Sequence, residues 1–523
     1  MAGYYAAKTK EISQREKDHM KEVRGLAGEC MTLLENDGTL PLKKTGKIAL
    51  YGNGARRTVK GGTGSGNVNS RSVATVEEGL KEAGFTVTTQ DWLDEYDRSA
   101  DEEQKNFLAQ IKKIAEESGK PEFGVMFSHQ LKEAPIPVIS SEMIAGSDTD
   151  TAIYVIARNS GEGCDRHNVE GDYLLSKTEL EALKTVAANY KNTIVILNVA
   201  NIIDTTALKE IEGIGAILLA GQAGNIGGYA VADVLTGKTL PSGKLTDTWA
   251  KAYADYPSGA TFSHNNGDVN DEYYEEGIFV GYRYFDTFNI TPNYCFGYGK
   301  GYTDFSIETI KVQADAQEIR VSVKVTNTGT EYAGREVVQV YYSAPDNVLE
   351  KPYQELAGFA KTKKLMPGES QELTICYKTA SMASYDEKRA AWVLEKGIYY
   401  VRVGNSSRNT RIASALQLEE EVLTVRLKNL FADTESLSEI KKAGTVSYSY
   451  PGEEEEKAAA RIFTINAAEI GQEMVLYSGK AGEFPAYTDD RLTMADVKSG
   501  KASLKDLVSQ LTVEEMADVC NGA

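Results

Sequence analysis

The apolar residues in the first half of the chain recur first at helical and then at strand spacing. Ser13 and Glu16 fit a capping box, and they predict a helix that continues to the turn at residues 36–38. Six residues carry its helical spacing: Val23, Leu26, Ala27, Cys30, Leu33 and Leu34. A second capped helix is predicted over residues 176–190, where Leu180, Leu183, Val186 and Ala187 share one face.

Four short apolar runs predict buried strands, at residues 47–51, 152–157, 193–199 and 216–220. The second and third runs are apolar without alternation, which is typical of central strands in a parallel sheet. A further helix should follow the fourth strand and end near Gly237. This alternation of strands and helices predicts a doubly wound α/β sandwich domain over residues 1–305.

Near Phe305 the hydrophobic period changes from 3.6 to 2. Strands are predicted at residues 319–325, 337–342, 373–377, 391–394 and 398–403, and Asn327-Thr-Gly329 forms a turn. Several short strands in a little over a hundred residues indicate a β-sandwich over residues 306–417.

The rest of the chain has a weaker pattern. Residues 418–500 are charge-rich, and we interpret them as a linker and extension, with the acidic run at Glu453–Glu456 in solvent. Residues 501–523 are expected to be helical, because Thr512 and Glu515 fit another capping box.

Composition narrows the class of protein. A length of 523 residues suggests roughly two to four domains, and the net charge of −19 argues against nucleic acid or an anionic membrane as a partner. The five cysteines are scattered without a Cys-x-x-Cys pair, and no apolar stretch reaches the length of about 18 residues that marks a membrane span. With no apolar signal core at the N-terminus, we expect reduced thiols and a cytoplasmic location.

The most glycine-dense segment is Gly61-Gly-Thr-Gly-Ser-Gly66. Its spacing fits neither a P-loop nor the dinucleotide fingerprint, since Asn67 stands where a third glycine is required. Two interpretations stay open: a plain mobile loop, or a tight loop at the carboxyl end of a sheet, where the backbone of Gly64 and the Ser65 hydroxyl approach a ligand.

Glu162 lies in the glycine-flanked run Asn159-Ser-Gly-Glu-Gly-Cys-Asp-Arg166, directly after a predicted central strand. Catalytic groups in open α/β sheets lie at that strand end. A carboxyl group that donates a proton near neutral pH needs partial burial or a neighbouring negative charge; Asp165 would provide that charge, while Arg166 would act in the opposite direction. The alternative is an acidic surface turn. The histidines show no metal-ligand spacing, and we expect no cofactor. The aromatic cluster at residues 273–285 either stacks on sugar rings or packs one domain against the next, and we favour packing.

Taken together, segments over roughly residues 20–410 resemble glycoside hydrolase family 3, the β-glucosidase-like enzymes. The matching segments follow the family's order for its second and third domains, and Lys300 departs from the leucine usual at its position. They are Leu33-Leu-Glu-Asn-Asp-Gly-Thr-Leu-Pro-Leu42, Gly61-Gly-Thr-Gly-Ser-Gly66, Gly161-Glu-Gly-Cys-Asp-Arg166, Leu240-Pro-Ser-Gly-Lys-Leu245, Glu276-Gly-Ile-Phe-Val-Gly-Tyr-Arg-Tyr-Phe-Asp286, Phe296-Gly-Tyr-Gly-Lys-Gly-Tyr-Thr303, Val325-Thr-Asn-Thr-Gly329, Glu336-Val-Val-Gln-Val-Tyr341 and Glu355-Leu-Ala-Gly-Phe359.

The resemblance implies specific roles. Glu162 matches the acid/base glutamate, Ser65 and Gly64 lie in the loop that contacts the sugar, and the β-sandwich corresponds to a fibronectin type III-like domain. The family's nucleophile is an aspartate in a Ser-Asp-Trp-like segment of a (β/α)8 barrel, and none of the three tryptophans here follows a Ser-Asp pair.

A subset of the family places the barrel last, and Leu511-Thr-Val-Glu-Glu-Met516 resembles that barrel's opening helix. We therefore expect this chain to be the N-terminal portion of a longer enzyme, inactive without the barrel-bearing portion as its partner. The expected activity is retaining hydrolysis of a β-linked oligosaccharide or glycoside, with glucose as the default sugar. The alternatives are β-xylosidase-type specificity, a non-catalytic carbohydrate-binding or interaction fragment, and a nucleotide-binding transferase that uses the glycine loop.

Overall fold

The computed structural model describes residues 10–64, 66–126, 129, 131–159, 165–430, 437–475 and 486–521. Its N-terminal domain is built on a six-stranded sheet in the order β1-β6-β5-β4-β2-β3. The strands are β1 (Thr32–Asn36), β2 (Lys47–Tyr51), β3 (Thr86–Val87), β4 (Thr151–Arg158), β5 (Asn192–Val199) and β6 (Ile214–Leu219). All neighbouring strands are parallel except β1, which pairs antiparallel with β6. The predicted parallel α/β sheet is thus confirmed.

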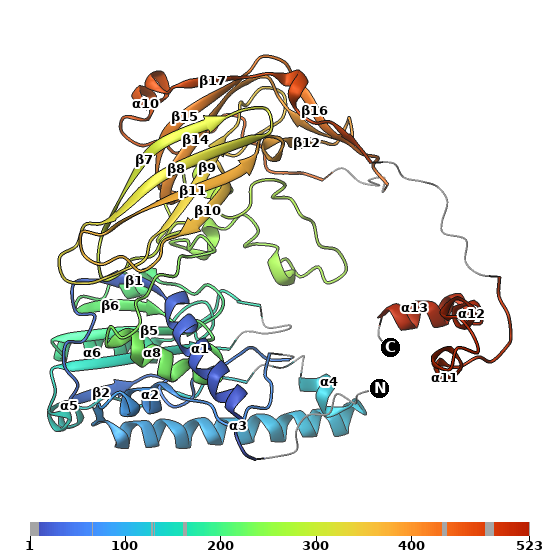
Figure 1. The fold of residues 1–523 in the computed structure, drawn as a ribbon. Coiled ribbons are helices and arrows are strands. Elements are labelled where there is room, and N and C mark those ends of the chain that lie inside the picture. The colour runs from blue at the N-terminus through green and yellow to red at the C-terminus, as the bar shows by residue number, and fades with distance from the viewer. Residues whose placement is uncertain are drawn as a thin grey trace.

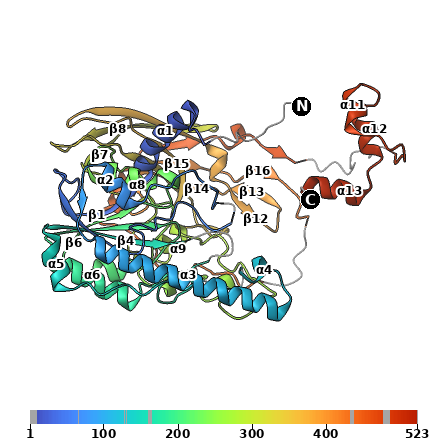
Figure 2. The same ribbon diagram turned by 90° about the horizontal axis from the view of Figure 1, so that it is seen from below.

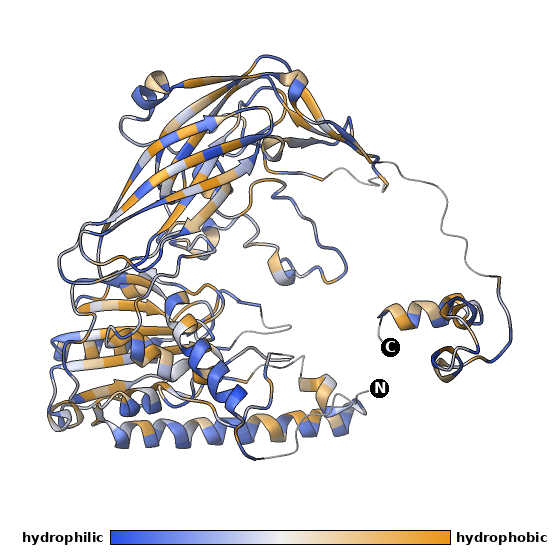
Figure 3. Ribbon diagram, in the orientation of Figure 1, coloured by the Kyte–Doolittle hydropathy of each residue, from blue (hydrophilic) through white to orange (hydrophobic). Residues whose placement is uncertain are grey.

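Helices cover both faces of this sheet (Figure 2). On one side lie α1 (Gln14–Cys30), α2 (Val76–Glu82) and α8 (Gly227–Leu235), and on the other lie α3 (Gln90–Ser118), α5 (Ser141–Ser147) and α6 (Lys177–Asn189). The short helices α4 (Glu122–Met126) and α7 (Thr206–Lys209) complete the domain. Capping boxes start α1 and α6 at Ser13 and Ser176, as predicted. The central strands are apolar along their length because both faces are covered (Figure 3).

The first predicted helix ends earlier than its apolar spacing indicated. Helix α1 ends at Cys30, and Leu33 and Leu34 instead lie in β1, fully buried. There the backbone of Leu33 pairs with Leu218 of β6. Two adjacent apolar residues suit a buried strand as well as a helix face, and the partner strand lies far away in the sequence, so the local pattern was wrong here.

The second domain is a β-sandwich with its own core (Figure 1). One sheet has the order β11-β8-β7 and the other β10-β9-β14-β15-β17. These strands are β7 (Phe305–Ala314), β8 (Glu318–Asn327), β9 (Val337–Ser343), β10 (Glu355–Lys361), β11 (Ser370–Lys378), β14 (Gly397–Ser406), β15 (Asn409–Leu418) and β17 (Ile462–Ile465). A smaller sheet, β12-β13-β16-β18, consists of β12 (Ser384–Asp386), β13 (Ala391–Leu394), β16 (Val422–Arg426) and β18 (Glu473–Met474).

Residues 418–475 differ from the predicted linker. Strand β17 pairs parallel with β15, and Ile465 and Ile470 belong to the core of the sandwich. The acidic run forms the start of helix α10 (Glu453–Ala459), where Glu453 is 1% exposed. Its carboxylate lies 2.5 Å from the guanidinium of Arg402, which is equally buried. Glu453 is buried because Arg402 provides a buried counter-charge, and this partner cannot be predicted from the residues near Glu453 in the sequence.

The aromatic cluster joins the two domains. Tyr282, at the start of helix α9 (Tyr282–Thr287), packs edge-on against Tyr341 of the sandwich with ring centroids 5.9 Å apart. The carboxylate of Asp286, 1% exposed, accepts a 2.5 Å hydrogen bond from Nε of Arg408. The packing interpretation of this part of the cluster is therefore confirmed.

The C-terminal segment forms three short helices that lie apart from both domains in the two views (Figures 1 and 2). They are α11 (Met494–Lys498), α12 (Leu504–Ser509) and α13 (Val513–Asn521), and the backbone and side chains of Thr512 and Glu515 bond reciprocally as predicted. The four described cysteines, Cys30, Cys295, Cys376 and Cys520, are free thiols. No helix in the described part of the chain is both long and apolar enough to span a membrane.

Candidate functional site

The candidate site lies where β4 ends, at the carboxyl edge of the parallel sheet. Arg158 is the last residue of β4, and Asn159 follows it. Of the predicted site residues, Gly64 is described, with a positive φ of 88° that suits glycine. Glu162 and Ser65 lie outside the described residues. The site is therefore built from the segments that flank them.

Those flanking segments touch each other. The side-chain amide of Asn159 donates a 2.5 Å hydrogen bond to the hydroxyl of Thr63, one residue before Gly64. Asn198, at the end of β5, holds the chain two residues before the glycine loop. Its Oδ1 accepts a hydrogen bond from the backbone N–H of Val59 at 2.6 Å, and its Nδ2 donates to the carbonyl of Val59 at 3.0 Å. The glycine loop and the segment that carries Glu162 thus meet at one edge of the sheet.

Arg166 ties together the two ends of the Glu162 segment. Its guanidinium donates 2.5 Å hydrogen bonds to the carbonyl of Asn159 and to the carboxylate of Asp172. The other carboxylate oxygen of Asp172 accepts from the backbone N–H of His167 at 2.8 Å. Arg166 therefore holds Asn159 close to the chain at residues 166–172.

A buried cluster of charged side chains, Arg158, Glu179 and Glu133, lies at the end of β4. The guanidinium of Arg158 makes paired hydrogen bonds of 2.8 and 2.7 Å to the carboxylate of Glu179, and these side chains are 4% and 1% exposed. Its Nε donates to the carbonyl of Asp172 at 3.1 Å. Glu133 approaches the same guanidinium at 3.7 Å. Burial, and then the charge of Glu179, raise the pKa of Glu133 to about 8.

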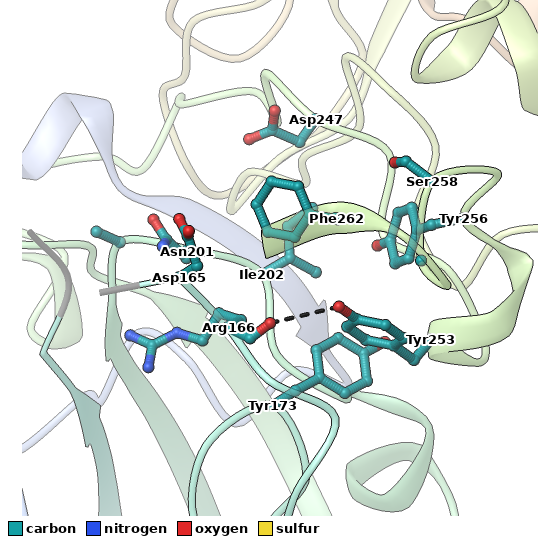
Figure 4. A pocket seen from close by; sticks show the side chains of 12 residues that line it. Asp165, Arg166, Tyr173, Asn201, Ile202, Asp247, Tyr253, Tyr256, Ser258 and Phe262 are labelled. Atoms are coloured by element: carbon teal, nitrogen blue, oxygen red, sulfur yellow. Dashed lines mark hydrogen bonds between the residues drawn. The ribbon is translucent and has the colours of Figure 1, made fainter. Parts of the chain in front are cut away.

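A cavity of about 340 Å³ is lined on one side by Asp165 and Arg166 (Figure 4). Its residues come from four separate segments: Asp165, Arg166, Tyr173, Ala200, Asn201, Ile202, Asp247, Tyr253, Tyr256, Ser258, Gly259 and Phe262. The rings of Tyr173 and Tyr253 pack edge-on with centroids 5.1 Å apart, and the Tyr253 hydroxyl donates to the carbonyl of Arg166 at 3.4 Å. The Arg166 guanidinium points away from these tyrosines (Figure 4).

This lining suits a sugar ring. Aromatic rings provide flat apolar surfaces for the C–H faces of a pyranose, and the carboxylates and amide of Asp165, Asn201 and Asp247 provide acceptors and donors for hydroxyl groups. Among the described residues, no group of three or more His, Cys, Asp or Glu side chains is placed to hold a metal ion. Sequence reasoning missed the cavity because Tyr253, Tyr256 and Phe262 belong to no local motif.

Comparison with known proteins matches both domains. Residues 31–282 match the glycosyl hydrolase family 3 C-terminal domain, and residues 336–407 match a fibronectin type III-like domain. β-Glucosidase A of Butyrivibrio fibrisolvens is 35% identical over 95% of this chain, which spans 64% of that protein. A β-glucosidase of Ruminococcus albus is 33% identical over 97% of the chain, which spans 50% of it.

Solved structures agree. β-Glucosidase 3B of Thermotoga neapolitana, in complex with α-D-glucose, superposes with a TM-score of 0.67 and 38% identity over 78% of this chain and 55% of its own. A β-glucosidase of Paenibacillus barengoltzii has a TM-score of 0.73 and 31% identity over 96% of this chain and 54% of its own.

An α/β domain with a sugar-sized aromatic cavity at its carboxyl edge, followed by a fibronectin type III-like sandwich, defines a glycoside hydrolase architecture. The chain belongs to glycoside hydrolase family 3. It spans between half and two thirds of the length of the curated relatives above.

Proposed function

We propose that this chain supplies the general acid/base of a retaining β-glucosidase, and that Glu162 is that residue. The observation that carries the proposal is the hydrogen bond from Asn159 to Thr63. It joins the glycine loop, which holds Ser65 and Gly64, to the segment that holds Glu162, beside a cavity with sugar-like lining. The relatives named as β-glucosidases support glucose as the sugar.

The proposed reaction needs a second carboxylate. An aspartate attacks the anomeric carbon while Glu162 protonates the leaving oxygen, and Glu162 then removes a proton from the water that releases the sugar. The two carboxyl groups of a retaining enzyme lie about 5–5.5 Å apart. No tryptophan of this sequence follows a Ser-Asp pair, so we propose that the nucleophile comes from a barrel domain outside these 523 residues.

The cavity is proposed to hold part of the glycoside. It adjoins Asp165, three residues after Glu162 in the sequence, which supports a substrate bound there with its scissile oxygen close to the proposed acid. Tyr173 and Tyr253 present ring edges and faces, while Asp247 and Asn201 provide hydrogen-bond acceptors. We propose that Ser65 and the backbone of Gly64 contact the same substrate.

The test is Glu162→Gln in the enzyme that includes the barrel. Activity on cellobiose, whose leaving sugar needs a proton, should fall by about 10²–10⁴-fold, since that is the usual contribution of general acid catalysis. Activity on a dinitrophenyl β-glucoside, whose leaving group needs none, should fall far less. The matched control is Glu170→Gln, a 53% exposed glutamate of the same segment. Full activity of Glu162→Gln on cellobiose would show that the assignment is wrong.

A second candidate is a non-catalytic carbohydrate-binding or interaction piece. An assay of the 523 residues on nitrophenyl β-glucoside, with and without the barrel fragment, separates the two. Turnover by the chain alone removes the need for an outside nucleophile, and turnover only with the fragment supports the proposal. A parallel assay on nitrophenyl β-xyloside distinguishes glucosidase from xylosidase specificity. The free thiols support a cytoplasmic location as part of the proposal.

A further inference from the structure

Glu133 lies behind the end of β4, and no step of the proposed reaction uses it. Its side chain is 21% exposed, but its Oε2 atom is buried and has no hydrogen-bond partner among the residues that the structure describes. Its Oε1 accepts a hydrogen bond from Nδ2 of Asn53. The same Nδ2 donates to the carbonyl of Ala157 at 3.1 Å, and Oδ1 of Asn53 accepts from the N–H of Ala157 at 2.7 Å. Through Asn53, Glu133 therefore braces the backbone where the Glu162 segment begins.

Glu133 also faces the segment that follows Glu162. A Cβ atom added to Gly171 would lie 3.5 Å from Oε2 of Glu133, so this oxygen is directed at the backbone there. The neighbouring carbonyl of Asp172 accepts from Nε of Arg158. Glu133 and Arg158 thus support the chain on both sides of residues 159–166, the first at Ala157 and the second at Asp172.

The charges around Glu133 are balanced only when it is neutral. In the described part of the chain, Arg158 of β4 is the cation that pairs with it, and Glu179 of α6 already binds this guanidinium through two hydrogen bonds. Among the described residues, the titratable side chains of Tyr96 on α3 and Tyr154 on β4 also face it; both are neutral phenols, and Asn53 brings no charge. Ionisation of Glu133 would therefore place a second buried carboxylate beside a single cation, which is costly.

We propose that neutral Glu133 is a positioning residue that holds the backbone at Ala157 and at Gly171–Asp172, on either side of the segment that carries Glu162, and that its ionisation loosens these contacts. This inference rests on the proposed function only for the role of Glu162. Because burial raises the pKa of Glu133 to about 8, the change should occur between pH 7 and pH 9. It predicts a loss of activity on the alkaline side that is independent of the protonation of Glu162.

The first test needs no catalysis. Hydrogen exchange of the 523-residue chain is measured from pH 6.5 to 9.5 and corrected for the intrinsic exchange rate. Protection of the amides at residues 165–174 should fall about 10-fold from pH 7 to pH 9, because one pH unit above its pKa a carboxyl group is about nine-tenths ionised. In Glu133→Gln, which keeps an acceptor for Asn53 and cannot ionise, protection should stay constant. The control Glu181→Gln, on the exposed face of α6, should behave as the unchanged chain does.

The inference is overturned if Glu133→Gln loses protection as the unchanged chain does, or if neither responds to pH. Should Glu133→Gln fail to fold, carbon-13 NMR of the glutamate carboxyl groups in the unchanged chain decides the matter. The absence of any glutamate that titrates between pH 7 and pH 9 would then overturn it.

The second test uses the enzyme with its barrel. Its kcat/KM on dinitrophenyl β-glucoside, which does not depend on protonation by Glu162, should fall about 10-fold by pH 9, and Glu133→Gln should remove that decrease. If no β-glucoside is cleaved while the exchange result holds, the proposed function fails and the positioning role stands. If Glu162→Gln gives its expected loss but Glu133→Gln leaves the alkaline decrease in place, the positioning role fails and the function stands.

Discussion

The buried ion pair of Arg158 and Glu179 should contribute strongly to the free energy of unfolding of the N-terminal domain. Arg158→Met leaves the Glu179 carboxylate, 1% exposed, without its cation. Removing one partner of a buried ion pair typically costs 3–5 kcal/mol. The carbonyl of Asp172 also loses its donor, which adds about 1 kcal/mol, whereas the carbonyl of Ala157 keeps the bond from Asn53. We therefore expect a loss of about 4–6 kcal/mol.

The double variant Arg158→Met/Glu179→Met tests the cause of that loss. Methionine at both positions fills the space without leaving a buried charge, and such replacements are often neutral. What remains lost is the bond to Asp172 and the capping box of Ser176 with Glu179, each worth about 1 kcal/mol. The double variant should thus cost about 2 kcal/mol, less than Arg158→Met alone.

The assay is urea unfolding followed by tryptophan fluorescence, because Trp92 is 1% exposed and packs within the same domain core. The control is Lys184→Met on the exposed face of α6, which should change the free energy of unfolding by no more than about 0.5 kcal/mol. Two results would refute the reasoning: a cost below about 1 kcal/mol for Arg158→Met, or a double variant whose cost equals the sum of the single ones.

Three further outcomes are expected. Burial alone would raise the pKa of Glu453, but the hydrogen bond from Arg402 outweighs burial and holds this pKa below its usual value of 4.5. The pair therefore stabilises the protein fully above pH 4.5, and this stabilisation is lost as the pH falls through the lowered pKa. Glu453→Gln should therefore lower the free energy of unfolding at pH 7 by about 3 kcal/mol and by much less at pH 3, and an equal loss at both would contradict this. Gly228→Ala should lower the melting temperature by several degrees, because its Cβ would lie 1.9 Å from a backbone oxygen at the start of α2. The control Gly25→Ala, whose Cβ would have nothing within 4 Å, should not lower it. Equal melting temperatures for the two variants would rule out the close contact. Tyr253→Ala in the enzyme with its barrel should raise KM for cellobiose about 2–10-fold with a smaller change in kcat, since an aromatic contact is worth about 0.5–1.5 kcal/mol. An unchanged KM would exclude the cavity from substrate binding.

Local chemistry was sufficient wherever a feature depends on neighbours in the sequence. The apolar runs of β4 and β5 predicted central parallel strands because a strand covered on both faces has no polar side. The capping boxes at Ser13 and Ser176 predicted the starts of two helices because the bonded atoms lie three residues apart. The period-2 pattern after residue 305 predicted the sandwich because successive side chains of a strand point to opposite faces of its sheet.

Features that depend on distant partners were missed. Leu33 and Leu34 were assigned to a helix because β6, their partner strand, lies some 180 residues further on. Glu453 was assigned to solvent because its counter-charge, Arg402, is 51 residues away. In both cases the local pattern was compatible with two structures, and burial against a remote segment selected one of them.

For the site itself, the division is similar. The sequence by itself determined that a glycine-flanked glutamate follows a central strand, since that order is a property of the chain. Only the tertiary structure decided that Thr63 meets Asn159, that Glu133 and Glu179 share one arginine behind them, and that four separate segments line one cavity. The physical reason is that hydrogen bonds, ion pairs and cavity walls act over a few ångströms of space, whereas the residues that make them are 20 to 100 positions apart in the chain.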